Sequence, residues 1–117
     1  MKPKLTLYVK PTCTTCRKVA RVLREEGVDF ESVDYYVESI SKSKLKVLLG
    51  KLGMRAREII RTKEKIYKTL NLAERKLTED ELIDLMKKYP DLIQRPIVEM
   101  RRKAVLARPA ERIRDIM

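Results

Sequence analysis

The 117-residue chain contains no histidine and no tryptophan, one phenylalanine and only two cysteines. Without histidine it lacks the usual general base, so serine, cysteine and metal-dependent hydrolase sites built on histidine are excluded. The scarcity of aromatic residues predicts a mostly aliphatic core. Zinc prefers four ligands and there is no second cysteine pair, so a zinc site within one chain is poorly supported, although a metal shared between two chains stays open. No bound cofactor is indicated.

Long apolar runs and targeting segments are also lacking. No apolar stretch approaches about 18 residues, so a membrane span is not expected. No hydrophobic segment follows the first four residues, so a signal peptide is not expected either. A reducing cytoplasm is then the expected compartment. The length suits a single domain over residues 1–117.

Basic residues exceed acidic ones, 28 Lys and Arg against 17 Asp and Glu, which gives a formal net charge of +11. The two signs are mixed along every predicted helix, and no block of five or six like charges occurs. An ordinary solvated basic face explains this pattern. Attraction of small oxyanions, acidic protein surfaces or nucleic acid is the alternative.

The first third of the chain is predicted to form a strand, a helix and a second strand. Residues 5–9 are a short β-prone run, and a helical pattern begins at Cys13 after a turn that contains proline. Gly27 lies where the C-terminal cap of that helix belongs. Residues 28–33 alternate apolar and polar side chains, as a half-buried strand does. The predicted apolar face of the helix comprises Val19, Ala20, Val22 and Leu23.

The middle of the chain is predicted to be helical. Ser41 is placed to cap a helix over 44–52, and short helices are expected over 56–60 and 64–70. A capping box at 78–81 begins a further helix. The predicted inward residues are Leu45, Leu48, Leu49 and Leu52 in the first of these helices, and Leu82, Ile83, Leu85 and Met86 in the last.

The C-terminal part is predicted to form a hairpin and a last helix. Residues 96–100 and 103–107 read as two antiparallel strands with a polar turn between them. Pro109 opens the last helix, whose apolar positions are Ile113, Ile116 and Met117. The element order β-α-β, helices, β-β-α predicts an α/β domain with a mixed four-stranded sheet. A helical insertion over about 38–90 separates its second and third strands.

The two cysteines, Cys13 and Cys16, lie three positions apart at the predicted start of the first helix. A bridge between them would close a tiny loop and hardly constrain the unfolded chain, so it is not a structural staple. Unpaired amides and the helix dipole favour a thiolate at this place, and Arg17 adds a positive charge. Cys16, one turn further on, could attack an adduct formed on Cys13. The alternative is a pair of buried small hydrophobic residues.

Pro96 stands at the very start of a predicted strand, after Gln94 and Arg95. This position fits the cis-proline that thioredoxin folds place facing the catalytic cysteine. An ordinary trans proline that begins a strand is the alternative.

A set of short segments spread over nearly the whole chain is far more specific than the cysteine pair alone. These segments are Leu7-Tyr8, Pro11–Lys18, Ile59–Arg61, Tyr67, Leu70, Leu72–Glu74, Leu77-Thr78, Gln94–Val98 and Ala107–Pro109. Taken in this order, they resemble the arsenate reductase (ArsC)/Spx family of thioredoxin-like proteins. The resemblance implies a thioredoxin-like fold.

The resemblance also implies roles for particular residues. In arsenate reductases, the cysteine that matches Cys13 attacks arsenate, and three arginines that match Arg61, Arg95 and Arg108 hold the oxyanion. The planar guanidinium suits this role because its paired N–H donors fit tetrahedral oxyanions and its charge is permanent. Helix-start amides, with Arg17 as a further anion-binding residue beside them, would complete the anion cradle. For each arginine, an exposed surface charge is the alternative.

Two functions follow from the resemblance. In the first, a reductase acts on arsenate or a disulfide, Cys16 resolves the adduct, and thioredoxin, glutaredoxin or a small thiol regenerates the dithiol. In the second, the cysteine pair is a redox switch, as in Spx, a regulator that binds the RNA polymerase α subunit. Many glutaredoxin-linked reductases carry a histidine at the position of Val9 and usually lack a cysteine at the position of Cys16. Spx-type sequences usually lack an arginine at the position of Arg61. A monomer is expected.

Overall fold

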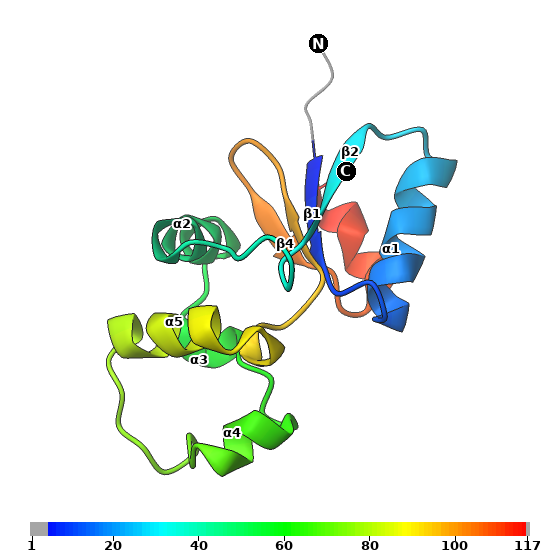
Figure 1. Cartoon of the computed structure of the whole chain (residues 1–117). Coiled ribbons are helices and arrows are strands. Elements are labelled where there is room, and N and C mark those ends of the chain that lie inside the picture. The colour runs from blue at the N-terminus through cyan, green and yellow to red at the C-terminus, as the bar shows by residue number, and fades with distance from the viewer. Residues whose placement is uncertain (1–4, 117) are drawn as a thin grey trace. The chain divides into compact units, whose positions relative to one another are not determined.

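The computed structural model describes residues 5–116, with side chains through residue 114. The chain divides into two compact units, one formed by Met1–Glu38 with Arg95–Met117 and the other by Ser39–Gln94. The first unit contains β1 (Leu5–Val9), α1 (Thr14–Glu25), β2 (Phe30–Asp34), β3 (Ile97–Glu99), β4 (Ala104–Leu106) and the 3-10 helix η2 (Ala110–Ile116). The second contains α2 (Lys42–Leu52), α3 (Ala56–Ile59), α4 (Lys65–Thr69), α5 (Glu79–Lys88) and the 3-10 helix η1 (Pro90–Leu92) (Figure 1).

The first unit is built on a sheet of four strands in the order β2-β1-β3-β4. β1 and β2 run parallel, with Leu7 opposite Ser32, and α1 makes the crossover between them. β3 runs antiparallel to both β1 and β4, with Val98 opposite Val105 in the hairpin. The mixed four-stranded α/β sheet predicted from the sequence is therefore confirmed.

The core of this unit lies on one face of the sheet. Alternate residues of β1 point the same way, so Leu5, Leu7 and Val9 are all buried there. The helices α1 and η2 cover that face, as Figure 1 shows, and complete an aliphatic core. Its remaining buried members are Cys16, Val19, Ala20, Leu23, Val98, Val105, Ala107, Ala110 and Ile113.

Both ends of α1 are fixed by local bonds. Cys13 is the N-cap residue, with extended backbone angles. At the other end Gly27 has a φ of +68°, a left-handed conformation that glycine adopts without steric cost. The N–H of Val28 then bonds back to the carbonyl of Leu23 at 2.9 Å, which closes the helix end. Because Val28 is committed to this closure, β2 begins at Phe30 rather than at Val28 as predicted.

In the second unit, side-chain caps begin two of the helices. Ser41 Oγ accepts a hydrogen bond from the N–H of Lys44 at 3.1 Å, and α2 starts at Lys42, two residues earlier than predicted. Thr78 and Glu81 bond each other's backbone N–H groups, so the predicted capping box is confirmed. Ion pairs between Lys42 and Asp84 and between Lys46 and Asp80, each 3.0 Å long, connect α2 with α5.

Several predicted details differ from the structure. Val22, Leu52 and Leu85 are only partly buried because they lie at the margins of their helices' apolar faces. The predicted strands over 96–100 and 103–107 are each three residues long. The last helix is a 3-10 helix that begins after Pro109, and Met117 lies outside the described residues. Among the residues described, no helix combines the length and apolarity needed to cross a membrane.

Candidate active site

Cys13 is held at the start of α1 by backbone bonds on both sides. Its N–H donates to the carbonyl of Lys10 at 2.9 Å, and its own carbonyl accepts from the N–H of Arg17 at 3.1 Å. Its Sγ accepts from the N–H of Cys16 at 3.3 Å. The sulfur therefore occupies the place of the side-chain oxygen in an ordinary N-cap, where an anion is favoured.

The two cysteines have opposite electrostatic environments. Burial raises the pKa of Cys13, but hydrogen bonds from the thiol and amide of Cys16, together with the nearby guanidinium of Arg95, outweigh it and hold the pKa below its usual range. Cys16 is 2% exposed, and burial, reinforced by its hydrogen bond to Cys13, raises its pKa to about 12. Cys13 is thus the more easily ionised thiol of the pair, and Cys16 the thiol that holds its proton more tightly.

Two arginines from the C-terminal part of the first unit gather at Cys13. Arg95, two residues before the start of β3, is 6% exposed and lies close enough to the Cys13 sulfur to lower its pKa. Arg108 Nη1 lies 4.0 Å from Cys13 Sγ and donates to the carbonyl oxygen of Arg95 at 3.2 Å. Each arginine precedes a cis peptide bond, to Pro96 and Pro109 respectively.

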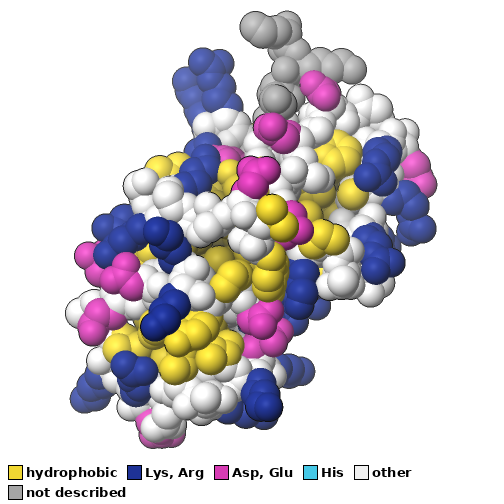
Figure 2. Space-filling view, viewed as in Figure 1, with side chains coloured by type: hydrophobic (Ala, Val, Ile, Leu, Met, Phe, Trp, Pro, Cys, Tyr) yellow, Lys and Arg dark blue, Asp and Glu magenta, His cyan; other side chains and the backbone are white. Residues whose placement is uncertain are grey.

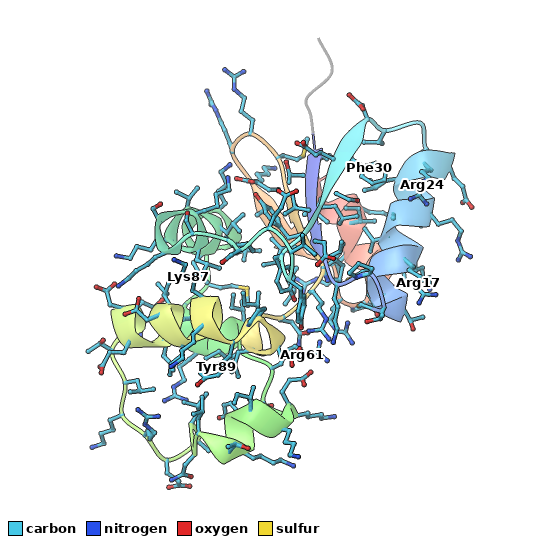
Figure 3. All side chains as sticks on the ribbon, in the orientation of Figure 1. Arg17, Arg24, Phe30, Arg61, Lys87 and Tyr89 are labelled. Carbon is cyan, nitrogen blue, oxygen red and sulfur yellow. The ribbon has the colours of Figure 1, made fainter. Side chains whose placement is uncertain are left out.

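Arg17 and Arg61, the other two predicted anion-binding residues, lie in different settings. Arg17 projects from the first turn of α1 (Figure 3), is exposed, and donates from its Nε to the carbonyl of Pro11 at 3.1 Å. Arg61 belongs to the second unit. There its Nε donates to Glu64 at 2.8 Å and its Nη1 to Gln94 at 2.6 Å. An anion-binding role for either residue stays a prediction.

A pocket of about 270 Å³ lies beside Cys16, between α1 and the edge strand β2. Its apolar residues are Leu7, Val9, Pro11, Cys16 and Ala20, and its polar and charged residues are Lys10, Arg17, Arg24, Ser32 and Asp34. Arg24 also lies over the ring of Phe30, and both are visible at this side of α1 in Figure 3.

Sequence reasoning missed two tyrosines at this site, Tyr35 and Tyr36, which follow β2. Arg95 Nη1 donates to the Tyr36 hydroxyl at 3.5 Å, and the Tyr35 ring stacks on the Tyr36 ring with centroids 5.1 Å apart. Burial disfavours the charge of Arg95, but Tyr35, Tyr36 and Cys13 favour it, and the net effect raises the pKa of Arg95. Two consecutive tyrosines after a strand are a weak signal, because the same pattern is common in ordinary cores.

On the face seen in Figure 2, charge is dispersed. Figure 2 shows Lys and Arg side chains scattered over the viewed face and interspersed with Asp and Glu. Within residues 5–116, no three His, Cys, Asp or Glu side chains gather as the ligands of a metal ion would. The concentrated chemistry in the first unit is therefore the cluster of Cys13, Cys16, Arg95 and Arg108.

Comparison with known proteins agrees with the resemblance read from the sequence. The chain matches the ArsC family over residues 8–116. It is 40% identical to the Escherichia coli K12 protein YfgD over 100% of this chain and 99% of that protein. It is 35% identical to an Escherichia coli arsenate reductase over 97% of this chain and 80% of that enzyme.

The similarity extends to the three-dimensional structure of a known protein. The arsenate reductase from Vibrio cholerae superposes with a TM-score of 0.95 at 33% identity, and the match covers 100% of both chains. A likeness this extensive in sequence and in backbone leaves one assignment: the chain is a member of the ArsC family with a thioredoxin-like fold.

Proposed function

We propose that the chain is a thiol-dependent reductase that reduces arsenate to arsenite, with Cys13 as its nucleophile. The observation that carries this proposal is the meeting of a lowered-pKa thiol with Arg95 and Arg108 at the start of a helix. A thiolate supplies the attacking electron pair, and the two guanidinium groups supply charge for a tetrahedral oxyanion. The family membership and the arsenate reductases among its relatives support arsenate as the anion.

The proposed reaction begins at the Cys13 sulfur. The thiolate attacks arsenic and displaces one hydroxyl group, which takes a proton from solvent and leaves as water. A sulfur–arsenic bond thus replaces an arsenic–oxygen bond while arsenic stays pentavalent. Arg95 and Arg108 offset the negative charge of the bound oxyanion. Arg61 is the third arginine that the family resemblance assigns to this task. Because arginine charges are permanent, the site attracts the anion across the whole physiological pH range.

Cys16 completes the electron transfer. Its sulfur attacks Cys13 Sγ to form the Cys13–Cys16 disulfide, and its proton passes to an oxygen of the departing arsenite. The sulfur–arsenic bond breaks, its electron pair goes to arsenic, and arsenite leaves. Burial, and then the hydrogen bond to the Cys13 sulfur, raise the pKa of Cys16 in the free chain. Formation of the adduct removes the second of these causes, because the facing sulfur is no longer a thiolate. A thioredoxin, a glutaredoxin or a small thiol then supplies the two electrons that reduce the disulfide.

The deciding experiment is coupled arsenate reduction by the purified chain, with thioredoxin and glutathione/glutaredoxin systems supplied separately. We expect turnover that vanishes in Cys13→Ser and falls in Arg95→Ala. Lys18→Ala is the matched control, because Lys18 pairs on the surface with Glu111 at 3.2 Å, and this variant should retain full activity. Full activity in Cys13→Ser would refute the mechanism. No turnover in the unaltered chain, with a readily reversible disulfide, would favour the redox-switched regulator instead.

A further inference from the structure

The turn after β2 places two tyrosines in a fixed arrangement. Asp34 Oδ1 accepts a hydrogen bond from the N–H of Tyr36 at 3.0 Å. The carbonyl of the same aspartate accepts from the N–H groups of Val37 and Glu38 at 3.0 and 2.8 Å. Tyr35 is buried and stacks on the Tyr36 ring, with an interplanar angle of 28°. The backbone and one ring face of Tyr36 are therefore held in place, although its side chain stays partly exposed.

Tyr36 contacts both of the segments that flank the Cys13 sulfur. Its hydroxyl accepts a hydrogen bond from Arg95 Nη1 at 3.5 Å. The Nζ of Lys10 lies over its ring, 5.0 Å from the centroid, as in a cation–π contact. Lys10 is also the residue whose carbonyl holds the N–H of Cys13 at 2.9 Å. One aromatic side chain thus joins the loop before the nucleophile to the arginine beside it.

We propose that Tyr36 is a positioning residue, which holds the Arg95 guanidinium against Cys13 through its hydroxyl group while Lys10 fixes its ring. An arginine side chain has many rotamers, and fixing it before the anion arrives removes an ordering cost from binding. The hydrogen bond that Arg95 donates to Tyr36 is long, so its contribution to the position of Arg95 is modest. Its part in arsenate binding rests on the proposed function, whereas its effect on the thiol of Cys13 does not.

Two neighbours limit what Tyr36 alone can do. The carbonyl of Arg95 also accepts a bond from Arg108, so the backbone of Arg95 has a second support. Tyr35 favours the charged form of Arg95 as well. Loss of the Tyr36 hydroxyl should therefore loosen the guanidinium without displacing the residue. The expected phenotype is a partial loss of thiolate stabilisation, smaller than the loss that Arg95→Ala causes.

The test measures ionisation of the Cys13 thiol in the reduced protein, from thiolate absorbance and from the rate of alkylation by iodoacetamide against pH. Tyr36→Phe keeps the ring and its stacking and removes only the hydroxyl. At neutral pH we expect alkylation to slow by roughly two- to fivefold and the titration to move to higher pH. Lys10→Met keeps most of the side-chain length and should give a smaller change in the same direction. Thermal unfolding of each variant checks that it is folded.

Tyr89→Phe is the matched control, since Tyr89 at the end of α5 also has a lysine, Lys88, over its ring at 5.4 Å. Its alkylation profile should coincide with that of the unaltered chain. A Tyr36→Phe profile that also coincides, while Arg95→Ala moves the titration, would overturn the proposal. An unchanged Lys10→Met would overturn the part assigned to Lys10.

A second readout separates this proposal from the proposed function. If arsenate is the substrate, Tyr36→Phe should raise KM more than it lowers kcat, because anion binding depends on the position of Arg95. The thiol measurement uses no arsenate. A chain that fails to turn over arsenate would refute the reductase assignment and leave the effect of Tyr36 on Cys13 still measurable.

Discussion

The Sγ atom of Cys13 accepts a hydrogen bond from the backbone N–H of Cys16, across 3.3 Å. The same three-residue spacing that brings the two thiols together thus also supplies the amide that stabilises one of them as an anion. The second sulfur is buried one turn into α1, where its own ionisation is opposed. Local helix geometry therefore makes the thiol of Cys13 easier to ionise than that of Cys16, and the arginines increase this difference.

This difference in ionisation between the two thiols predicts selective alkylation. An ordinary cysteine has a pKa of about 8.5, and the lowered pKa of Cys13 extends its reactivity to more acidic solutions. Cys16, with its pKa raised to about 12, stays protonated at neutral pH. Iodoacetamide at neutral pH should therefore label Cys13 almost exclusively, as peptide mass mapping would show. Denaturant should remove the difference, and equal labelling in the folded chain would contradict the assignment.

Replacing Cys16 by serine should separate the two steps of the proposed reaction. The backbone N–H of residue 16 is retained, so the Cys13 sulfur keeps one of its donors and still attacks arsenate. Without the second sulfur no internal disulfide forms, and the Cys13 adduct should accumulate during turnover, detectable as a mass increase of the intact protein. Turnover at the unaltered rate would mean that an external thiol, not Cys16, resolves the adduct.

The fold could be predicted largely from local signals, because caps and periodicity act over a few residues. The capping box at Thr78 and the positive-φ glycine at position 27 are examples. Other features depend on the surroundings. Val28 continues the alternating pattern of β2, yet its N–H is used to close α1. A local pattern does not reveal which of two competing bonds forms.

The site was harder to predict than the fold, for the same reason. The cysteine pair can be recognised from its spacing in the sequence, but the charged residues around it come from distant segments. Arg108 reaches Cys13 across 95 positions and Arg95 reaches Tyr36 across 59 positions. No periodicity marks which of many arginines gather at one sulfur. The resemblance to a family supplied the arginines, and Tyr36 became visible only in the structure.

Arg108 provides a further prediction. Its Nη1 lies between the Cys13 sulfur and the Arg95 carbonyl, so Arg108→Ala removes a charge from the proposed anion site and a support from Arg95. Charge-assisted hydrogen bonds contribute about 1.5–3 kcal/mol, so KM for arsenate should rise at least about tenfold. Arg108→Lys keeps the charge but not the paired donors and should recover part of the loss. Arg114→Ala, an exposed arginine on η2, is the control. An unchanged KM in Arg108→Ala would place Arg108 outside the anion site.

Tyr8 and Glu99 form a buried pair in the sheet that carries the site. The hydroxyl of Tyr8 donates to Glu99 Oε1 at 2.9 Å, and both side chains are 6% exposed. Tyr8→Phe removes this donor from a buried carboxylate, which should lower the free energy of unfolding by about 1–3 kcal/mol. Urea unfolding would measure the change, with Tyr89→Phe as the control for loss of a hydroxyl.

The same pair predicts how the effect depends on pH. Burial, reinforced by the bond to Glu99, raises the pKa of Tyr8 in the folded chain, whereas an unfolded tyrosine titrates near about 10. Above that pH the unfolded chain releases the Tyr8 proton while the folded chain retains it, so stability falls as pH rises. The contribution of Tyr8 is therefore complete below about pH 10 and is lost progressively above it. Because phenylalanine has no proton to release, the difference between Tyr8→Phe and the unaltered chain should shrink in alkaline solution. If the free energies of unfolding of the two proteins stay parallel as pH rises, the folded chain does not raise the pKa of Tyr8.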